Sequence, residues 1–544
     1  MTRREAWLTA GGLFVLALVV RALVASTVPF PTPEDTAYYY GVARNLVEGR
    51  GLVSDAIWSY GTPPLVFPRP AFEVWLPLPS LIAAVPMLVL GTGFHAAQVA
   101  TVIMGALVPV LAWRLAADVA DERGLPAGRA RTLAVGSGLT AIVLLPLVLH
   151  GILPDSTTPF TVIALAACLL MTRLAQDATR EEAGDGRLLA LGALFGLAAL
   201  TRNEFAWLGL AWVVVVWRAA RGIPMRAQRL RLVAVPAAIG ALVLAPWLAR
   251  DWLTFGSPVP GQAATNALSV SGFDIFAYEQ PPTLARYLAQ GPAWLVSSRL
   301  EGLAHNLFSV LLIPSVPVGI VGLLALPWTG TARTLRPLLL LSVLTFVATT
   351  ILFPVATTWG TFLHAAGPVF VLLIVSCLLV LDRFIAWVGV RRAWTRPVAW
   401  LGPALTLFMA TLFSVGILGY ASQARQVEER YEALGPALAA AGLGNLATPV
   451  ISDFPIWYAE GMHHAALALP DEPPSSVLAL ARRFGAQLLV ISKPDHGQWP
   501  AVIDRGGPSA GCFHELALPS PSDAGDAATL QGTRVFTIAL VGCP

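Results

Sequence analysis

The chain has 544 residues, of which 56% are hydrophobic and 12% charged, and its mean hydropathy is +0.68. A soluble protein of this length needs more charged side chains to cover its surface, so the composition excludes an ordinary soluble globular protein. The net charge of +3 is not gathered into one basic patch, so no nucleic-acid partner is expected. Lys493 is the only lysine, and this preference for arginine suggests a GC-rich bacterial gene.

Apolar segments close to the ~20 residues that span a bilayer recur along the first four-fifths of the chain. Examples are the segments 7–28, 102–119, 338–353 and 401–420. The first segment follows Arg3 and Arg4 as a signal peptide would. It lacks a small-residue cleavage site, however, so we expect a retained span. The sequence therefore predicts a multi-pass protein of the cell membrane.

The arginines predict the orientation, because cytoplasmic loops carry an excess of positive charge. They form clusters at 3–4, 114–131, 173–187, 218–231, 333–336 and 383–396. If every cluster is cytoplasmic, one of the apolar segments between Arg4 and Arg114 does not cross. The segment 75–91 is short and rich in proline, so we interpret it as a juxtamembrane or re-entrant helix. This leaves about eleven spans, a cytoplasmic N-terminus and an extracytoplasmic C-terminal part.

The predicted architecture is a mainly α, polytopic transmembrane bundle with a small α/β domain at its C-terminal end. Residues 1–420 would form the membrane module, with outer loops at 29–93 and 251–302, and residues 421–544 a linker and the domain. Within the domain, strand-length runs at 449–452, 487–492 and 534–541 alternate with a helical stretch at 474–484.

The four cysteines divide between these two parts. Cys512 and Cys543 fall in the predicted outer domain, where they could form a disulfide or remain two free thiols. Cys168 and Cys377 fall in apolar spans, where we expect packing residues.

Ionisable side chains near a membrane are costly, so they are candidates for function. In the first outer loop, Glu34 and Asp35 begin a stretch with helical spacing, at the end where the helix dipole favours carboxylates. One face of this helix would carry Ala37, Tyr38, Gly41, Arg44, Asn45 and Glu48. The two acids could simply cap the helix or could belong to a site. Glu73 could be a solvated loop charge or join them.

Three further segments place polar residues near the outer face. Asp155 could cap the span that follows it or direct a third carboxylate into the same outer cavity. Arg202 and Glu204 lie at the tip of a hairpin with arms of about 15 residues, shorter than a ~30 Å hydrocarbon core. They could neutralise each other, or Arg202 could bind a phosphate. His364 starts a span from the same side, and a lone histidine there is more often structural.

Four stretches resemble the polytopic GT-C glycosyltransferases, a superfamily that includes bacterial relatives of protein O-mannosyltransferases and of the aminoarabinose transferase. The first is Pro33-Glu34-Asp35 with 38–51, similar to an acidic first-loop motif in the reverse order. The second is Leu200-Thr201-Arg202-Asn203-Glu204. The third is Pro246-Trp247-Leu248-Ala249-Arg250-Asp251-Trp252 with Phe255-Gly256-Ser257-Pro258. The fourth is the tail from 451 to 491, which is similar to an exported α/β domain.

The resemblance implies transfer of a hexose or pentose from a polyprenyl-phosphate donor to an acceptor hydroxyl or amine at the outer face, with inversion. Glu34 or Asp35 would be the base and Asp155 a second acid that orients the acceptor. Arg202 or Arg250 would hold the phosphate, and His364 could assist there.

The resemblance also bears on which residues support the site and on whether the site binds a metal ion. Tyr38, Arg44, Glu73 and Glu204 would support the site. Some relatives bind a divalent metal and others need none, and Glu34, Asp35 and Asp155 would be its ligands here. The acceptor stays open.

Two other functions compete with this one. A transporter or lipid flippase would use intramembrane acids and arginines along a substrate path, but it predicts matching interrupted helices in two halves, and the acids crowd into the first third. A non-catalytic scaffold would leave these charged residues without a shared purpose. Convergence of the side chains on one outer cavity would separate the alternatives.

Overall fold

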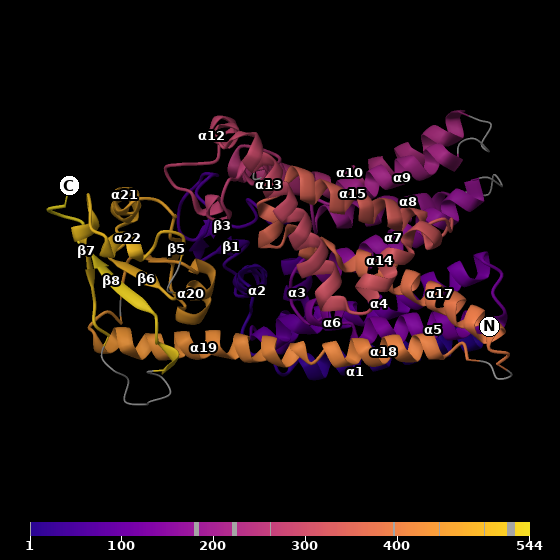
Figure 1. Ribbon diagram of the computed structural model, residues 1–544. Helices are drawn as coiled ribbons and strands as arrows, with labels where there is room; N and C mark the ends of the chain where they lie inside the picture. Colours follow the sequence, from indigo (N-terminus) through magenta and orange to yellow (C-terminus); the bar gives the residue numbers. More distant parts are fainter. Residues whose placement is uncertain are drawn as a thin grey trace.

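The computed structural model describes residues 2–178, 184–219, 226–261, 263–394, 398–444, 446–493, 496–518 and 528–543. It has two parts, a bundle of helices and a smaller domain built around a β-sheet at one end of that bundle (Figure 1). The N-terminus lies at the opposite end of the bundle from the sheet.

The bundle is formed by long apolar helices and the shorter helices between them. They are α1 (Arg3–Ala25), α4 (Phe94–Glu122), α5 (Ala127–Val143), α6 (Leu145–His150), α7 (Thr157–Ala178), α8 (Asp185–Ala199), α9 (Phe205–Ala219), α10 (Arg226–Phe255), α14 (Val318–Thr329), α15 (Arg336–Leu352), α17 (Gly367–Arg391) and α18 (Leu401–Phe413).

Shorter elements lie between the bundle and the sheet or along the outer loops. The helices are α2 (Glu34–Val47), α3 (Leu78–Leu90), α11 (Ala263–Leu268), α12 (Leu284–Ala289), α13 (Gly291–Ala304) and α16 (Thr361–Ala365). Short 3-10 or π turns lie at Gly272–Phe276, His305–Leu312, Ile313–Ser315, Ala356–Trp359 and Ala510–Cys512. A small hairpin pairs β1 (Val53–Ser54) with β3 (Arg69–Pro70).

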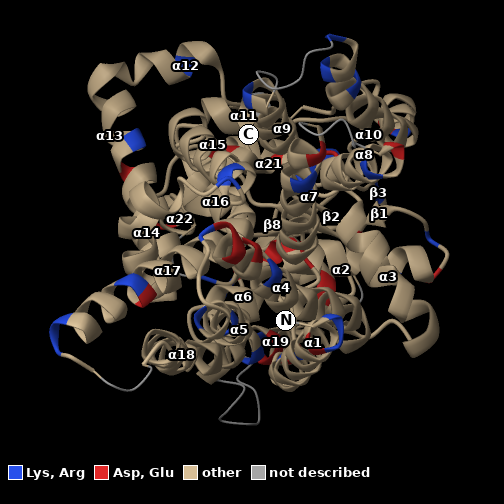
Figure 2. Ribbon diagram, turned by 90° about the vertical axis from the view of Figure 1, so that its right-hand side faces the viewer, with Lys and Arg blue, Asp and Glu red and all other residues tan. Residues whose placement is uncertain are grey.

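Packing divides the helices into inner and outer ones. Most of α7 and α17 is buried, whereas α1 and α10 expose apolar side chains such as Trp7, Leu23 and Leu242. Viewed from the end that carries the N-terminus, most of the ribbon is uncharged (Figure 2). Side chains of this kind on an outer surface match a lipid environment, which has no water to solvate polar groups.

Small residues bring neighbouring helices together. A Cβ added to Gly196 of α8 would lie 2.4 Å from the Val243 Cβ of α10, so only glycine permits this approach.

Within the described residues, six helices are long and apolar enough to cross a membrane, or seven if the bent pair Gly291–Ser315 and Val318–Thr329 forms one span. Shorter apolar helices are α3, α9 and α15. The multi-pass architecture is therefore confirmed, while the count of about eleven spans and the side on which each terminus lies stay predictions. The segment 75–91 contains α3, a helix of 13 residues that is too short for a straight crossing.

The C-terminal domain (residues 446–543) contains five of the six strands of one sheet, in the order β2-β5-β4-β6-β8-β7. Its strands are β4 (Val450–Ser452), β5 (Ala466–Ala468), β6 (Leu488–Ile491), β7 (Phe513–Glu515) and β8 (Arg534–Ile538), and its helices are α20 (Pro455–Met462), α21 (Pro474–Phe484) and α22 (Ala501–Asp504). The strands β2, β5, β4 and β6 are parallel, and β8 and β7 extend the sheet in antiparallel fashion.

The sixth strand, β2 (Ala56–Ile57), comes from the first outer loop and pairs with β5 at the edge of the sheet. The Tyr60 hydroxyl that follows β2 donates to the Ala468 carbonyl at 2.5 Å. The domain and the first outer loop thus share one sheet, which the sequence did not predict. Strands of two or three residues are too short to show an alternating pattern.

The predicted elements of the domain are present. The strands β4, β6 and β8 and the helix α21 fall within the predicted ranges. Cys512 and Cys543 form a disulfide, which is one of the two alternatives that the sequence left open. Cys168 and Cys377 are buried free thiols, as expected of packing residues. The strands β5 and β7 were not predicted.

Two consecutive helices join the two parts. Helix α18 is followed after a two-residue turn by α19 (Gly416–Ala440), and together they span the 40 residues Leu401–Ala440 along one side of the molecule (Figure 1). Helix α19 passes residue 420, where the sequence suggests the division into two domains, and that division stays a prediction.

Candidate functional site

The candidate site lies where α2 meets the ends of the bundle helices nearest the sheet, the side that the sequence predicts to be the outer one (Figure 1). Asp35, in the first turn of α2, places its Oδ2 atom 3.4 Å from His364 Nε2, in the short helix α16. Trp75 also donates a side-chain hydrogen bond to Asp35. Burial, reinforced by the negative charge of Asp155, raises the pKa of Asp35 to about 6.

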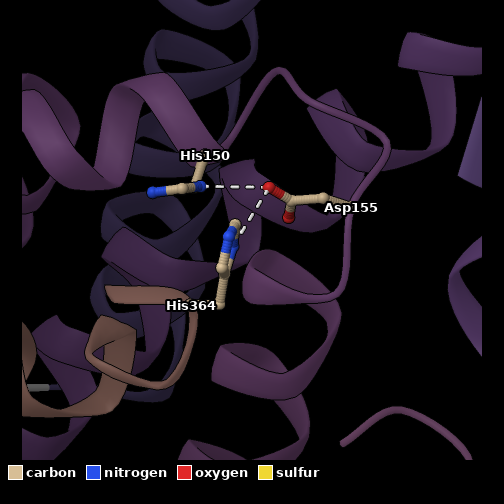
Figure 3. Close-up of side chains that lie close together, drawn as sticks. All are labelled: His150, Asp155 and His364. Atoms are coloured by element: carbon tan, nitrogen blue, oxygen red, sulfur yellow. Dashed lines mark hydrogen bonds and ion pairs between the residues drawn. The ribbon is translucent and has the colours of Figure 1, made fainter. Parts of the chain in front are cut away.

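Asp155 lies in the turn between α6 and α7 and is held by histidine (Figure 3). His150 Nδ1 donates to Asp155 Oδ2 at 3.1 Å, and the Thr157 backbone N–H donates to Oδ1 at 2.8 Å. Burial alone would raise the pKa of Asp155, but the hydrogen bond from His150 and the electrostatic interaction with that ring hold the pKa of Asp155 below its usual range. Asp155 thus caps the start of α7 through one oxygen, as one of the two interpretations predicts, and faces the two imidazoles with the other.

His364 connects the two carboxylates. Its Nδ1 lies 2.9 Å from the Thr157 hydroxyl and 3.8 Å from Asp155 Oδ2. Burial lowers the pKa of His364 to about 3, so the ring is neutral at pH 7. The direction of the hydrogen bond between Thr157 and Nδ1 depends on the tautomer of the ring, and in the tautomer that carries its proton on Nε2 this nitrogen is the one nearest Asp35.

The predicted hairpin tip adds an arginine to this group. Arg202 lies between α8 and α9, helices of 15 residues each, and forms a two-point contact with Glu204 at 2.9 and 3.0 Å. Its NH1 group donates to the Ser156 hydroxyl at 2.7 Å, one residue from Asp155. The charge of Arg202 also acts on Asp35, where it favours the ionised carboxylate. We name Asp35, Asp155, Arg202, His150 and His364 the outer cluster.

Accessibility distinguishes the members of the outer cluster. The Asp35 side chain is 33% exposed, whereas the Asp155 side chain is fully buried and that of His364 is 8% exposed. Asp35 is therefore the carboxylate that an incoming molecule can reach, and the other groups surround it.

Glu34, the neighbouring acid, does not join this cluster. Its Oε1 atom accepts a hydrogen bond from the Ile456 backbone N–H at 3.1 Å, in the first turn of α20. Burial raises the pKa of Glu34 to about 8, and the negative charge of Asp453 adds to that rise. Adjacent residues on a helix point about 100° apart, so α2 directs one acid to the domain and the other to the outer cluster.

Three of the residues that were predicted to support the site, Arg44, Glu73 and Tyr38, form contacts outside the outer cluster. The Arg44 guanidinium pairs with Glu460 of α20 at 2.6 Å. Glu73 pairs with Arg69 at 3.0 Å, with both side chains only 1% exposed, and it is not the solvated loop charge that one interpretation suggested. The Tyr38 hydroxyl accepts a hydrogen bond from the Phe72 backbone N–H at 2.7 Å.

Arg250 lies apart from the outer cluster. It donates to Asp251 at 2.9 Å, and its guanidinium lies over the rings of Trp247 and Phe255. Its positive charge also favours the ionised form of the Glu73 carboxyl group. Among the described residues, no hydrogen bond or ion pair joins Arg250 to Asp35, Asp155 or His364.

Three members of the outer cluster have the donor atoms to hold a metal ion. The ligand atoms of His150, Asp155 and His364 lie within 4.8 Å of one another. Two imidazoles and one carboxylate suit zinc or another transition metal better than magnesium or calcium, which prefer oxygen. The predicted ligand Glu34 is engaged on α20 and does not fit this set.

Sequence reasoning missed His150, Ser156, Thr157 and Trp75 as parts of this site. His150 and Asp155 are five residues apart and belong to a tight turn, so their contact depends on how α6 ends. The signal in the sequence that could have identified His150 was its position close to Asp155 in a predicted outer turn. Trp75 gave none, because tryptophan is common near membrane surfaces.

A scan against protein-family models and a search of curated proteins gave no match. Among solved structures, the chain resembles apo ArnT from Cupriavidus metallidurans, with a TM-score of 0.52 and 15% sequence identity over 100% of both chains. It also resembles ArnT from the same organism bound to undecaprenyl phosphate, with a TM-score of 0.53 and 14% identity over 96% of this chain and 97% of the other. The chain thus shares the ArnT fold, which confirms the predicted similarity in fold to the aminoarabinose transferase.

Proposed function

We propose that this chain is a membrane glycosyltransferase that moves a sugar from a polyprenyl-phosphate donor to an acceptor hydroxyl or amine at the outer face of the membrane. The observation that carries the proposal is the outer cluster, in which side chains from three other segments of the chain surround the accessible carboxylate of Asp35. The ArnT fold supports it, since one ArnT structure holds undecaprenyl phosphate.

Asp35 is the proposed base. A general base works best when its pKa lies near the operating pH, and burial brings the pKa of Asp35 to about 6. The neutral His364 ring orients the carboxylate through Nε2, 3.4 Å away. Glu34 is not the proposed base, because its carboxylate is engaged on the backbone of α20.

The proposed reaction is an inverting displacement at the anomeric carbon. The acceptor oxygen or nitrogen forms a bond to that carbon as its proton moves to an Asp35 oxygen. The bond from the anomeric carbon to the phosphate oxygen breaks, and its electron pair stays on the departing polyprenyl phosphate. A cation near that oxygen stabilises the growing negative charge.

Arg202 is the proposed cation on the phosphate side. It is the arginine whose charge acts on Asp35, and a guanidinium binds phosphate oxygens with directed hydrogen bonds. Glu204 and Ser156 hold it in place at 2.7 to 3.0 Å. Asp155 is proposed to orient His364 and the acceptor from its buried position. A metal ion bound by His150, Asp155 and His364 would supply positive charge at the same place.

The test is to replace the two neighbouring acids separately in the full-length protein. Release of undecaprenyl phosphate would be followed from synthetic undecaprenyl-phosphate hexoses and pentoses with a panel of hydroxyl and amine acceptors. We expect Asp35→Asn to lower kcat by about 10²- to 10⁴-fold, the usual contribution of a general base. Glu34→Gln is the matched control and should retain activity within about threefold, because an amide oxygen still accepts the Ile456 N–H. Full activity of Asp35→Asn would refute the assignment.

A further inference from the structure

Glu34 occupies the place in the C-terminal domain where sheets of this kind bind ligands. The chain passes from β4 to its neighbour β5 and then crosses to β6 on the other side of β4. Open α/β sheets bind ligands outside the carboxyl ends of the strands at such a reversal. Here Asp453, which follows β4, accepts backbone N–H groups of Ser492 and Lys493, which follow β6, at 2.8 and 3.0 Å.

The chain itself fills this crevice. Glu34 accepts the Ile456 N–H at the start of α20, the helix that follows β4, and its carboxylate is close enough to Asp453 for their charges to interact. The first N–H groups of a helix have no partner within the helix, so the Glu34 carboxyl oxygen satisfies one of them. The domain therefore uses this crevice to hold α2.

A second contact holds α2 farther along its length. Arg44 pairs with Glu460 at 2.6 Å, ten residues after Glu34 and about 15 Å along a helix. Between the two contacts Gly41 faces α20, and a Cβ added there would lie 3.6 Å from Glu460 Oε2.

The face of α2 predicted from the sequence is the face that meets the domain. Ala37, Tyr38, Gly41, Arg44 and Asn45 line a cavity of only about 20 Å³ with Ile456, Ala459 and Glu460. That volume is close to the minimum for one water molecule, so the two helices are closely fitted. The two contacts and the close fit together fix the rotation of α2 about its axis and its position along that axis.

We infer that Glu34, Arg44 and Glu460 are positioning residues through which the C-terminal domain sets the direction of Asp35, so that the domain is a working part of the active centre. Glu34 docks the helix, and the next residue points into the outer cluster. The inference rests on the proposed function for its effect on catalysis, while the docking itself rests only on the contacts described. A displacement of about 1 Å at a reacting group can cost about 10²-fold in rate.

The experiment compares Glu34→Gln, Glu34→Ala and Glu460→Ala in the full-length protein in lipid nanodiscs. The readouts are kcat and donor KM for undecaprenyl phosphate release, and hydrogen exchange of α2. We expect Glu34→Ala and Glu460→Ala to lower kcat by about 10- to 100-fold, with donor KM within about threefold and faster exchange across 34–47. Glu34→Gln should restore both readouts, because it keeps the acceptor oxygen.

Ser476→Ala is the matched control. It removes a contact between the domain and the outer loop at Glu279 (2.6 Å) without touching α2, and should leave both readouts unchanged. Wild-type kcat and exchange in both alanine variants would overturn the inference. A Glu34→Gln variant as defective as Glu34→Ala would also overturn it, because the charge and not the docking contact would then matter.

Failure of the proposed function has a different signature. If Asp35→Asn keeps full activity while Glu34→Ala speeds hydrogen exchange of α2, the assignment of Asp35 as the base is refuted. The docking of α2 by Glu34 is then still supported. Glu460→Ala acts at the other end of α2 and keeps the inference testable if Glu34→Ala does not fold.

Discussion

At the scale of single residues, two adjacent acids on one helix have different surroundings. Both begin α2, and nothing in their local sequence distinguishes them. Asp35 reaches His364 at 3.4 Å, while Glu34 reaches the backbone of Ile456 at 3.1 Å. The difference comes from partners more than 300 residues away in the sequence, which explains why the sequence left the choice of base open.

The pKa of Asp35 predicts the acid limb of the pH profile. A base must be ionised to accept a proton, and burial has raised the pKa of Asp35 from its ordinary value to about 6. We expect kcat/KM to fall about tenfold per pH unit below about pH 6 and to level off above it. The measurement is undecaprenyl phosphate release between pH 4.5 and 8.5, with protein integrity checked at each pH. A profile that is flat down to pH 5 would contradict the assignment.

The two candidate phosphate-binding arginines can be separated by binding. We expect Arg202→Gln to weaken undecaprenyl phosphate binding by about 10- to 100-fold, since a charge-assisted hydrogen bond contributes roughly 1.5–3 kcal/mol. Arg250→Gln should change it less than threefold, because Arg250 lies over Trp247 and Phe255 and away from the outer cluster. Binding to nanodisc-embedded protein would be measured calorimetrically. The opposite ranking would transfer the phosphate role to Arg250.

At the scale of elements, periodicity and length predicted what depends on local sequence. The hairpin of α8 and α9 has the predicted arms around Arg202, and α2 begins at the predicted acids. The face that we assigned to Tyr38 and Arg44 meets α20, while Tyr39 and Val42, which lie off that face, are buried as well.

Elements that depend on distant partners were not predictable. The strand β2 has two residues and becomes a strand only because the edge of β5 is available to it. The contact of His150 with Asp155 likewise requires a tight turn of the chain after α6 ends at His150. Short elements of this kind carry no periodic signal.

The disulfide also acts between elements, because it links Cys512, just before β7, to Cys543 in the chain beyond β8. It closes a loop with a sequence separation of 31 residues, for which loss of chain entropy predicts a stabilisation of roughly 3–4 kcal/mol. We expect reduction with dithiothreitol, or the pair Cys512→Ser and Cys543→Ser, to lower the melting temperature of the C-terminal domain. Cys168→Ala is the control and should keep the response to dithiothreitol. An unchanged melting temperature after reduction would contradict the prediction.

At the scale of the whole molecule, composition predicted a membrane protein, and the lengths of the apolar runs predicted a small α/β domain at its C-terminal end. What neither could predict is how strongly the two parts are joined. The helices α18 and α19, which follow each other after a two-residue turn, connect the two parts, and β2 crosses from the first loop into the sheet. Glu472 accepts backbone N–H groups of Tyr278, Glu279 and Gln280 from a second loop. Each of these joins depends on segments that are far apart in the sequence.

The shared sheet has a consequence for biosynthesis. Tyr60 and its hydrogen-bond partner Ala468 are 408 residues apart, so the first loop leaves the ribosome long before the strand that completes its fold exists. Until translation reaches the last hundred residues, the bundle can insert into the bilayer, but β2 has no neighbour. A nascent chain therefore lacks the contacts of the C-terminal domain that hold α2, and a prematurely terminated one leaves the β2 segment without its partner, where cellular quality control can recognise it.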